Sequence, residues 1–171
     1  LGDTRVAAFG MTRRRDAAAA DDPAVRGLAE CFAPVITVVG KTWDLHVDEV
    51  LRISREENLA MLTDSLAFCN EHPDCEEVFY DAEHFFDGYR ANRDYALQTL
   101  KAALKGGATR LVLCDTNGGS LPSLISQAVT DLPNELAADV KVAIHTHNDA
   151  ALAHANILAS VDAGAAHAQC T

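Results

Sequence analysis

Two histidines, one residue apart, end a strongly apolar run in the segment VAIHTHNDAA at positions 142–151. In an extended strand, residues i and i+2 point to the same side, so His145 and His147 would present both imidazoles together. Two imidazoles on one strand, completed by ligands from other strands or by water, suit a divalent metal ion. Asn148 and Asp149 can then turn the chain and cap the next helix. Two polar strand-end residues bonded to neighbouring loops are the alternative, but HxHND after a buried strand favours metal binding.

A second group of polar residues lies in FYDAEHFFDGY, at positions 79–89, directly after another apolar run. Asp81 and Glu83 share one face of the expected strand, and His84 follows them. A carboxylate in this place can accept a proton, orient a substrate or bind a metal through water. The alternative is a loop acid that caps a helix or forms an ion pair.

A third group lies in VLCDTNGGS, at positions 112–120, where Asp115, Thr116 and Asn117 end a strand. The two glycines that follow allow a tight turn or a close approach of backbone to a ligand. This composition is common in turns and is a weak signal alone. Because three successive strands place polar residues at the same end, the three groups together indicate one site.

The segment GKTWDLHV, at positions 40–47, ends one further strand of the series. Lys41, Asp44 and His46 could face the same opening as the other polar groups. A loop packed over Trp43 explains the segment equally well. We therefore keep His46 as a candidate for substrate binding with this alternative open.

Short β-rich runs alternate with longer segments of helical period along the whole chain. The expected strands are 5–10, 34–40, 76–82, 109–116, 140–147 and 166–171. The expected helical stretches lie near 23–32, 47–71, 92–105, 120–137 and 149–163. Six strands separated by five helices predict repeated β-α units and a parallel sheet.

The two faces of the strand at 140–147 favour a barrel over an open doubly wound sheet. Val140, Val142 and Ile144 are bulky and apolar, whereas the alternate positions include His145 and His147. One face would therefore pack on helices, and the other would carry polar groups near the carboxyl end, as the interior of a (β/α)8 barrel does. Six strands are two fewer than a complete barrel needs.

Composition excludes several classes of protein. The 171 residues are 49% hydrophobic and contain no apolar run of the roughly 20 residues that a membrane helix needs. The formal net charge of −11 argues against a nucleic-acid partner, since phosphates are bound mainly by Lys and Arg. Five cysteines without a CxxC pair indicate free thiols in a reducing compartment, and residues 1–10 lack a secretory signal pattern, so we expect a cytoplasmic protein.

Taken together, these motifs resemble the metal-dependent (β/α)8 barrel family that includes isopropylmalate, homocitrate and citramalate synthases and hydroxymethylglutaryl-CoA lyase. The resemblance covers essentially the whole chain: KTWDLHV, SREENLAMLTDSLAF, DAEHFFDGY, CDTNGG, HTHND and the terminal QCT. DAEHFFDGY and CDTNGG are closest to the citramalate synthase branch. The chain is similar to strands 3 to 8 of the barrel, so we expect residues 1–171 to be an incomplete catalytic domain.

The resemblance also implies roles for individual residues. His145 and His147 correspond to the two histidine ligands of a divalent metal ion, which would be Mg²⁺, Mn²⁺ or Zn²⁺. Glu83 matches a glutamate near the reacting centre, and Thr116 matches a threonine that holds the carboxylate of a 2-oxo acid. Thr37 stands where isopropylmalate synthases often carry a histidine, which fits a different 2-oxo acid, and Asp81 is a further candidate for substrate binding. The family's remaining ligand, an Asp in a DTTLRDG-like motif, has no match here.

The implied reaction is an acyl transfer that condenses acetyl-CoA with pyruvate to give citramalate and CoA, in the biosynthesis of isoleucine. The full-length protein would be a homodimer, and residues 1–171 alone would be inactive. Four alternatives stay open: a 2-isopropylmalate or homocitrate synthase, a carbon–carbon lyase or aldolase of the same superfamily, an amidohydrolase-like metal hydrolase, and an inert fragment with exposed sheet edges.

Overall fold

The computed structural model describes residues 2–136 and 139–170. Six strands form a single sheet in which each pairs in parallel with the next along the chain. The strands are β1 (Ala7–Met11), β2 (Val35–Lys41), β3 (Glu77–Glu83), β4 (Arg110–Asp115), β5 (Lys141–Thr146) and β6 (His167–Gln169). A doubly wound sheet reverses its strand order at a switch point, whereas a barrel keeps its strands in sequence. The order β1 to β6 therefore confirms the predicted partial barrel.

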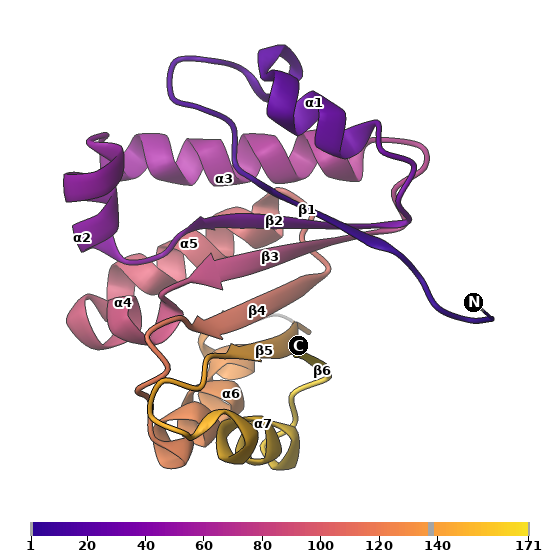
Figure 1. Cartoon of the computed structure of the whole chain (residues 1–171). Coiled ribbons are helices and arrows are strands. Elements are labelled where there is room, and N and C mark those ends of the chain that lie inside the picture. The colour runs from indigo at the N-terminus through magenta and orange to yellow at the C-terminus, as the bar shows by residue number, and fades with distance from the viewer. Residues whose placement is uncertain (1, 137–138, 171) are drawn as a thin grey trace.

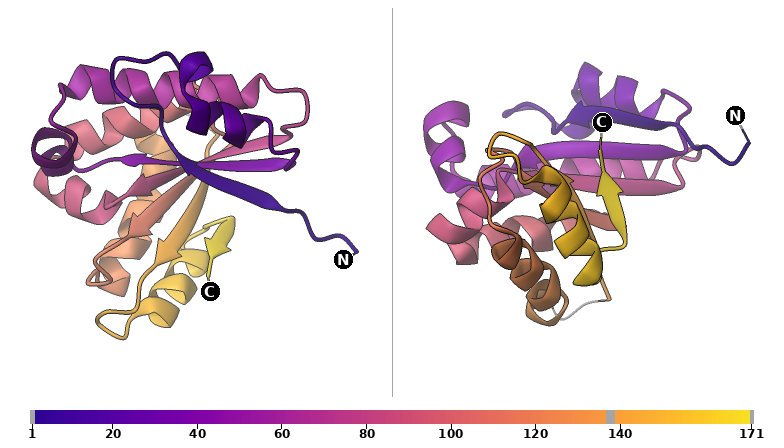
Figure 2. Two further views of the ribbon diagram at one scale, coloured as in Figure 1. Left: turned by 45° about the horizontal axis from the view of Figure 1, so that its top comes forward. Right: turned by 60° about the horizontal axis from the view of Figure 1, so that its bottom comes forward.

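The helices cover one face of a curved sheet, and the opposite face is left open (Figure 1). The two further views in Figure 2 show the same half-barrel, with β1 and β6 at its two edges. The helical segments are α1 (Pro23–Ala29), α2 (Asp44–His46), α3 (Arg55–Asn70), α4 (Phe85–Ala91), α5 (Arg93–Lys105), α6 (Pro122–Leu136) and α7 (Ala153–Asp162), with a 3₁₀ turn at Ala19–Asp21 and a π-helical turn at Val47–Leu51.

The prediction of one helical stretch over 47–71 is wrong in one respect, because the helix is interrupted after the π-helical turn. Arg52 adopts a left-handed backbone with φ of 55°. Ser54 then starts α3, since its hydroxyl accepts a hydrogen bond from the backbone N–H of Glu57. The residues from Val47 to Leu51 thus form a separate turn above the end of β2.

The other boundaries differ less from the expected ones. Helix α4 was not expected, and it occupies part of the segment that carries the second polar group. The last strand spans only His167–Gln169 of the expected 166–171, and Thr171 lies outside the described residues. Residue 137, the expected end of the helix from 120, also lies outside them.

Alternation along the strands separates the main core from the open face. Side chains at every second position point toward the helices and are fully or almost fully buried there: Ile36, Val38, Val78, Tyr80, Leu111, Leu113, Val142 and Ile144. The intervening positions form a smaller apolar cluster on the other face: Val35, Phe79, Val112, Cys114 and Ala143. The prediction that Val142 and Ile144 pack on helices is therefore confirmed, and the face that carries His145 is the inner face of the barrel.

Among residues 2–136 and 139–170, none of the helices combines the length and the apolar character that a membrane-spanning segment requires. The five cysteines all lie within the described ranges, and each is a free thiol, as expected.

Substitution of Leu113 by alanine tests whether the sheet–helix core stabilises the half-barrel. Leu113 is fully buried, so L113A should lower the free energy of unfolding by about 2–5 kcal/mol through lost burial and a residual cavity. Leu158 on α7 is 67% exposed, and L158A should change it by no more than about 0.5 kcal/mol. Urea unfolding of the three proteins measures both values, and equal effects would contradict the assignment of the core.

Candidate active site

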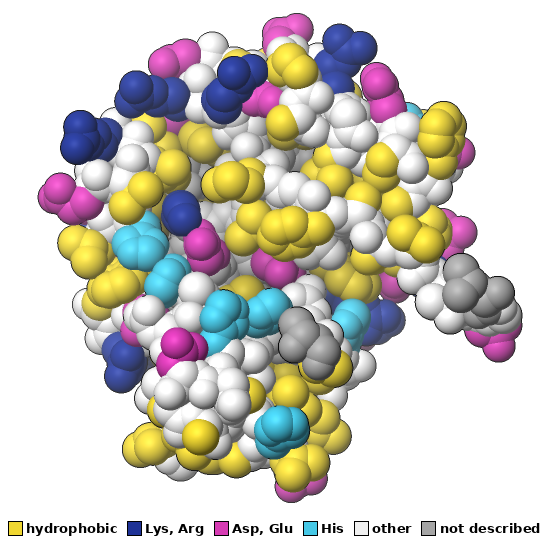
Figure 3. Space-filling view, viewed as in Figure 1, with side chains coloured by type: hydrophobic (Ala, Val, Ile, Leu, Met, Phe, Trp, Pro, Cys, Tyr) yellow, Lys and Arg dark blue, Asp and Glu magenta, His cyan; other side chains and the backbone are white. Residues whose placement is uncertain are grey.

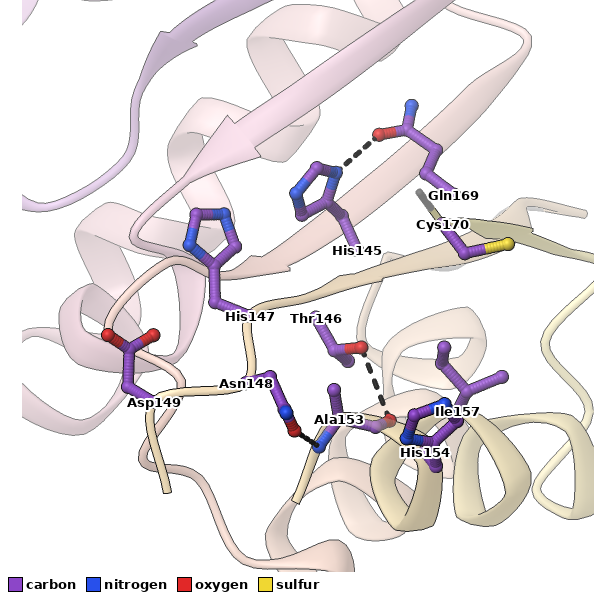
Figure 4. A pocket seen from close by; sticks show the side chains of 10 residues that line it. All are labelled: His145, Thr146, His147, Asn148, Asp149, Ala153, His154, Ile157, Gln169 and Cys170. Carbon is purple, nitrogen blue, oxygen red and sulfur yellow. Dashed lines mark hydrogen bonds between the residues drawn. The ribbon is translucent and has the colours of Figure 1, made fainter. Parts of the chain in front are cut away.

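The imidazoles of His145 and His147 lie on the same side of the chain at the carboxyl end of β5, as the sequence spacing predicts (Figure 4). Their ring centroids are 5.1 Å apart. Both line a cavity of about 560 Å³ between the end of β5 and the first turn of α7. The backbone after them is fixed by Asn148, whose side-chain oxygen accepts from the N–H of Ala153 at 3.2 Å.

A hydrogen-bonded chain of three side chains fixes the tautomer of His145. The amide nitrogen of Gln169 donates to Oδ1 of Asp81 at 3.0 Å, which leaves the amide oxygen to face His145. That oxygen accepts from Nδ1 of His145 at 2.8 Å. With its proton on Nδ1, His145 carries a lone pair on Nε2. A histidine that binds a metal is oriented in this way by an acceptor on its other nitrogen.

Asp81 and Thr37 lie deeper on the inner face and line a second cavity of about 430 Å³ together with His145 and Gln169. Asp81 is only 4% exposed, and burial raises its pKa to about 6, although the hydrogen bond from Gln169 and the nearby His145 oppose this. Thr37 is 5% exposed on the middle of β2. The structure thus brings together Thr37, Asp81 and His145, which come from three strands.

The donor set of this inner face suits a divalent metal ion in part. His145 is pre-oriented for metal binding, and His147 stands beside it at the mouth of the cavity. In the part of the chain that the structure describes, no group of three or more His, Cys, Asp or Glu side chains is close enough to hold a metal ion. Two imidazoles leave several coordination positions for water or substrate. The described residues therefore fit a metal as a two-histidine half-site.

The loop after β4 contacts the backbone of the segment that begins at His147. Gly118 has φ of +60°, and a Cβ there would lie 2.8 Å from the backbone nitrogen of Asp149 and 3.0 Å from the carbonyl carbon of His147. The N–H of Ala150 donates to the carbonyl of Gly118 at 3.1 Å. Only glycine combines this conformation with this close approach. Gly118 therefore acts on the position of His147 through direct backbone contact.

Asp115 forms hydrogen bonds within the same loop, and its side chain does not face the two histidines. Its carboxylate accepts from the hydroxyl of Ser120 at 2.7 Å and lies 3.4 Å from the amide nitrogen of the buried Asn156 on α7. Asp115 is 2% exposed. Of the third polar group in the sequence, Asp115 is thus structural, whereas Thr116 accepts from the N–H of His84 and Asn117 donates to Asp87 near the end of β3.

The remaining candidate residues form a second group, at the ends of β2 and β3. Glu83 is ion-paired with Lys41, its direct neighbour in the sheet register. The hydroxyl of Thr116 accepts from the backbone N–H of His84 at 2.9 Å. His46 packs edge-to-face on the ring of His84, with centroids 4.5 Å apart. Figure 3 shows histidine side chains gathered on this face, over the carboxyl ends of the strands.

Gln169 is the functional candidate that reasoning from the sequence missed. Its signal is present in the sequence, since Gln169 lies in the expected last strand and begins the QCT motif. What the sequence does not state is the register, in which His145 lies beside Gln169 across β5 and β6. That pairing brings the amide oxygen of Gln169 within hydrogen-bond distance of His145, so that Gln169 orients the ring.

A comparison with models of known families adds to this geometry. The family model described as HMGL-like matches residues 1–171, which is the whole chain. The chain belongs to the HMGL-like family. Members of this family generally depend on a divalent metal ion. Because the HMGL-like model matches the whole chain, the amidohydrolase-like alternative is set aside.

Similar proteins agree with this HMGL-like assignment. The chain is 48% identical over 163 residues to an (R)-citramalate synthase of Aquifex aeolicus (strain VF5), which covers 95% of this chain and 30% of that protein. It is 33% identical over 157 residues to a 2-isopropylmalate synthase of Stenotrophomonas maltophilia (strain R551-3), and this match covers 88% of this chain and 28% of that protein. The crystal structure of an HMG-CoA lyase from Brucella melitensis superposes with a TM-score of 0.74 at 15% identity, over 96% of this chain and 55% of that one.

These comparisons differ in what they establish for this HMGL-like chain. The likeness to the lyase shows the fold alone, because the identity is low. Five curated (R)-citramalate synthases are 43–48% identical to the chain over nearly its whole length. The chain spans about a third of the length of these curated relatives.

Gly118→Ala tests the contact between the loops after β4 and β5. The positive φ and the short Cβ contacts should lower the free energy of unfolding by about 2 kcal/mol and shift the NMR signals of the His147 ring. Gly119 is the matched control, since the nearest atom to an added Cβ there would be the carbonyl oxygen of Asn117, 4.0 Å away. G119A should stay within about 0.5 kcal/mol of the unmodified protein. An unchanged His147 ring in G118A would contradict the supporting role of Gly118.

The raised pKa of Asp81 predicts a pH dependence of stability in metal-free buffer. Between the ordinary value of 3.8 and about 6, the folded protein holds a proton that the unfolded chain has lost, so stability should fall as pH rises through this window. The fall should amount to about 3 kcal/mol at most. Asp81→Asn should flatten it, whereas the exposed Asp162→Asn should not. Urea unfolding across the window measures this, and parallel curves for D81N and the unmodified protein would contradict it.

Proposed function

We propose that this chain is the part of a citramalate synthase that binds the metal and the 2-oxo acid, in an enzyme that condenses acetyl-CoA with pyruvate to give (R)-citramalate and CoA. The observation that carries the proposal is the pair His145 and His147 on the inner face, in a chain 43–48% identical to curated (R)-citramalate synthases. The substrates and the transfer reaction are inferred from those relatives.

His145 and His147 would hold Mg²⁺, Mn²⁺ or Zn²⁺. When bound, such an ion supplies Lewis-acid polarisation of a keto group and a fixed point of attachment for its carboxylate. Gln169 orients His145 so that the Nε2 lone pair is available. Gly118 supports the backbone of His147. These contacts pre-organise the half-site before a ligand arrives.

Other residues of the chain would bind the 2-oxo acid. Thr116 accepts a hydrogen bond from the N–H of His84, so its own hydroxyl proton is free to donate to a carboxylate oxygen. Thr37 and Asp81 line the deeper cavity, and the small side chain of Thr37 there suits a short acid such as pyruvate. Glu83, paired with Lys41, would orient the reacting groups at the strand ends. His46 lies in the second group, where the acetyl thioester would approach.

The alternative function of a 2-isopropylmalate or homocitrate synthase has weaker support, since three curated relatives named as 2-isopropylmalate synthases are only 32–33% identical to the chain. A homodimer of the full-length protein and a cytoplasmic location stay predictions.

The assay that decides between these functions uses the natural full-length gene product with acetyl-CoA, MnCl₂ and either pyruvate or 3-methyl-2-oxobutanoate. Thiol release and chiral chromatography should show (R)-citramalate from pyruvate. Turnover of 3-methyl-2-oxobutanoate alone, or cleavage of a 3-hydroxyacyl-CoA, would refute the proposal.

His145→Ala and His147→Ala test the half-site directly. Each should weaken binding of Mn²⁺ by about 10-fold or more and abolish metal-dependent thiol release, because one of two imidazole ligands is lost. His72→Ala is the control, since His72 lies in the turn between α3 and β3, on a different connection. Calorimetric titration with MnCl₂ measures affinity without reference to activity. Unchanged Mn²⁺ affinity in both variants would refute the metal site.

A further inference from the structure

A single row of side chains crosses the inner face at the level of His145. The register pairs Lys41 on β2 with Glu83 on β3. It pairs His145 on β5 with Cys114 on β4 and with Gln169 on β6. The β3–β4 ladder ends one pair earlier and places Glu83 and Cys114 at the same level. Because neighbouring strands are about 4.8 Å apart, Glu83 lies only two strand spacings from the proposed metal ligand His145.

Lys41 and Glu83 form an ion pair in this row. Nζ of Lys41 donates to Oε2 of Glu83, and the two side chains are only 14% and 27% exposed. Oε1 of the same carboxylate accepts no hydrogen bond from the described residues, and it is not sealed from solvent. The ion pair therefore occupies one oxygen of Glu83 and leaves the other oxygen open.

The backbone under the ion pair is fixed on both strands. The carbonyl of Lys41 accepts from the side-chain amide of the buried Asn58 at 2.9 Å, and that amide also lies 2.9 Å from the hydroxyl of Tyr95. The N–H of Thr42 donates to the carbonyl of Glu83 at 3.3 Å. Within the part of the chain that the structure describes, Lys41 is the only donor to the carboxylate of Glu83. The orientation of this carboxylate therefore depends on Lys41.

The inner face around Glu83 also carries a second carboxylate. Burial raises the pKa of the Cys114 thiol well above its usual range, and the carboxylates of Asp81 and Glu83 add to the effect. These two carboxylates therefore lie on the same side of the sheet, close to Cys114. Like charges that share a face repel each other, and an ammonium group beside one of them offsets the repulsion. Lys41 supplies this positive charge at Glu83.

The proposed condensation needs a group that accepts a proton from the methyl carbon of the acetyl thioester. A carboxylate can do so when one of its oxygens is free and aligned with the C–H bond. Asp81 lies deeper and accepts from Gln169, whereas Glu83 keeps Oε1 free in the row that contains His145. The fixed orientation of Glu83 is therefore directly relevant to this step.

We propose that Lys41 is a positioning residue that holds Oε2 of Glu83, so that Oε1 is aligned for proton transfer with the substrates. This inference rests on the proposed function and adds a residue to it. In the step, the methyl C–H bond breaks, its electron pair forms the enolate of the thioester, and the proton passes to Oε1. The enolate carbon bonds to the keto carbon of pyruvate, and the former keto oxygen takes the proton from Glu83. Water then cleaves the thioester and releases CoA, and Lys41 keeps its protons throughout.

The test is a double-mutant cycle in the natural full-length gene product, with acetyl-CoA and pyruvate as substrates. Lys41→Met removes the ammonium group at similar length and should lower kcat by about 30-fold, while KM for each substrate stays within about threefold. Glu83→Gln should lower kcat by more than K41M does. The double variant K41M/E83Q should be no slower than E83Q, because Lys41 acts only through Glu83.

Two further variants serve as controls. Lys41→Arg should keep kcat within about fivefold of the unmodified value, since a guanidinium group also pairs with a carboxylate. Lys101→Met is the matched control, because Lys101 is exposed on α5, and K101M should leave kcat unchanged. If circular dichroism shows that K41M does not fold, K41R and the double variant, in which both charges are absent, still decide the question.

Exchange of deuterium from [²H₃]acetyl-CoA into water, with oxamate in place of pyruvate, follows proton transfer without product formation. The exchange rate should fall in K41M by about the same factor as kcat, and K41M should add no loss to E83Q. This second readout does not require that citramalate is the product.

The outcomes separate this inference from the proposed function. An unchanged kcat in K41M, or a further loss when K41M is added to E83Q, would overturn the positioning role. A raised KM at unchanged kcat would assign Lys41 to direct substrate binding and would also overturn it. Exchange that depends on Lys41 through Glu83, without any citramalate from pyruvate, would support this inference and refute the proposed function. Citramalate formation that does not respond to K41M would do the reverse.

Discussion

The structure depends above all on the alternation of side chains along six parallel strands that pair in sequence. Every second residue packs against the helices, so the intervening residues must face the concave side. This constraint places Thr37, Asp81 and His145 on one surface although they are far apart in the sequence. A slip of one residue in β5 would move His145 into the helix-facing core and Ile144 onto the inner face. The large apolar residues of β5 therefore fix the position of the histidine.

The strands determine from which face of the sheet each side chain projects. The loops beyond the strand ends need further contacts to hold their conformation. The loop after β4 provides them on both sides. Asp115 and Ser120 connect it to Asn156 on α7, while Gly118 contacts the backbone of His147. In the other direction, Asn117 donates to Asp87 beside His84. One loop thus positions residues of both polar groups, which explains why its sequence combines hydrogen-bonding side chains with a glycine at position 118.

Much of this arrangement could be predicted from the sequence because it follows from local periodicity. Alternation in 140–147 identified both the buried face and the histidine pair, and polar residues at successive strand ends indicated one site. What could not be predicted depends on contacts distant in sequence. The pairing of His145 with Gln169 follows from register, and the separate roles of Asp115 and Thr116 follow from the different partners that their side chains meet at the end of β4. The left-handed residues Arg52 and His84, which end or precede helices, also leave no signal in hydrophobic periodicity.

Electrostatics limits what the inner face can bind without a metal ion. The chain has a net charge of −11, yet the proposed substrates carry negative charge. Lys41 and Glu83 neutralise each other, and Asp81, whose pKa burial raises only to about 6, is still largely ionised at neutral pH, so the inner face offers an anion no net positive charge of its own. Attraction for a 2-oxo acid would therefore come mainly from an ion held by the two neutral imidazoles, which add no opposing charge. The carboxylates of the second group do not oppose that attraction, because Glu83 is paired with Lys41 and Asp87 with Arg90.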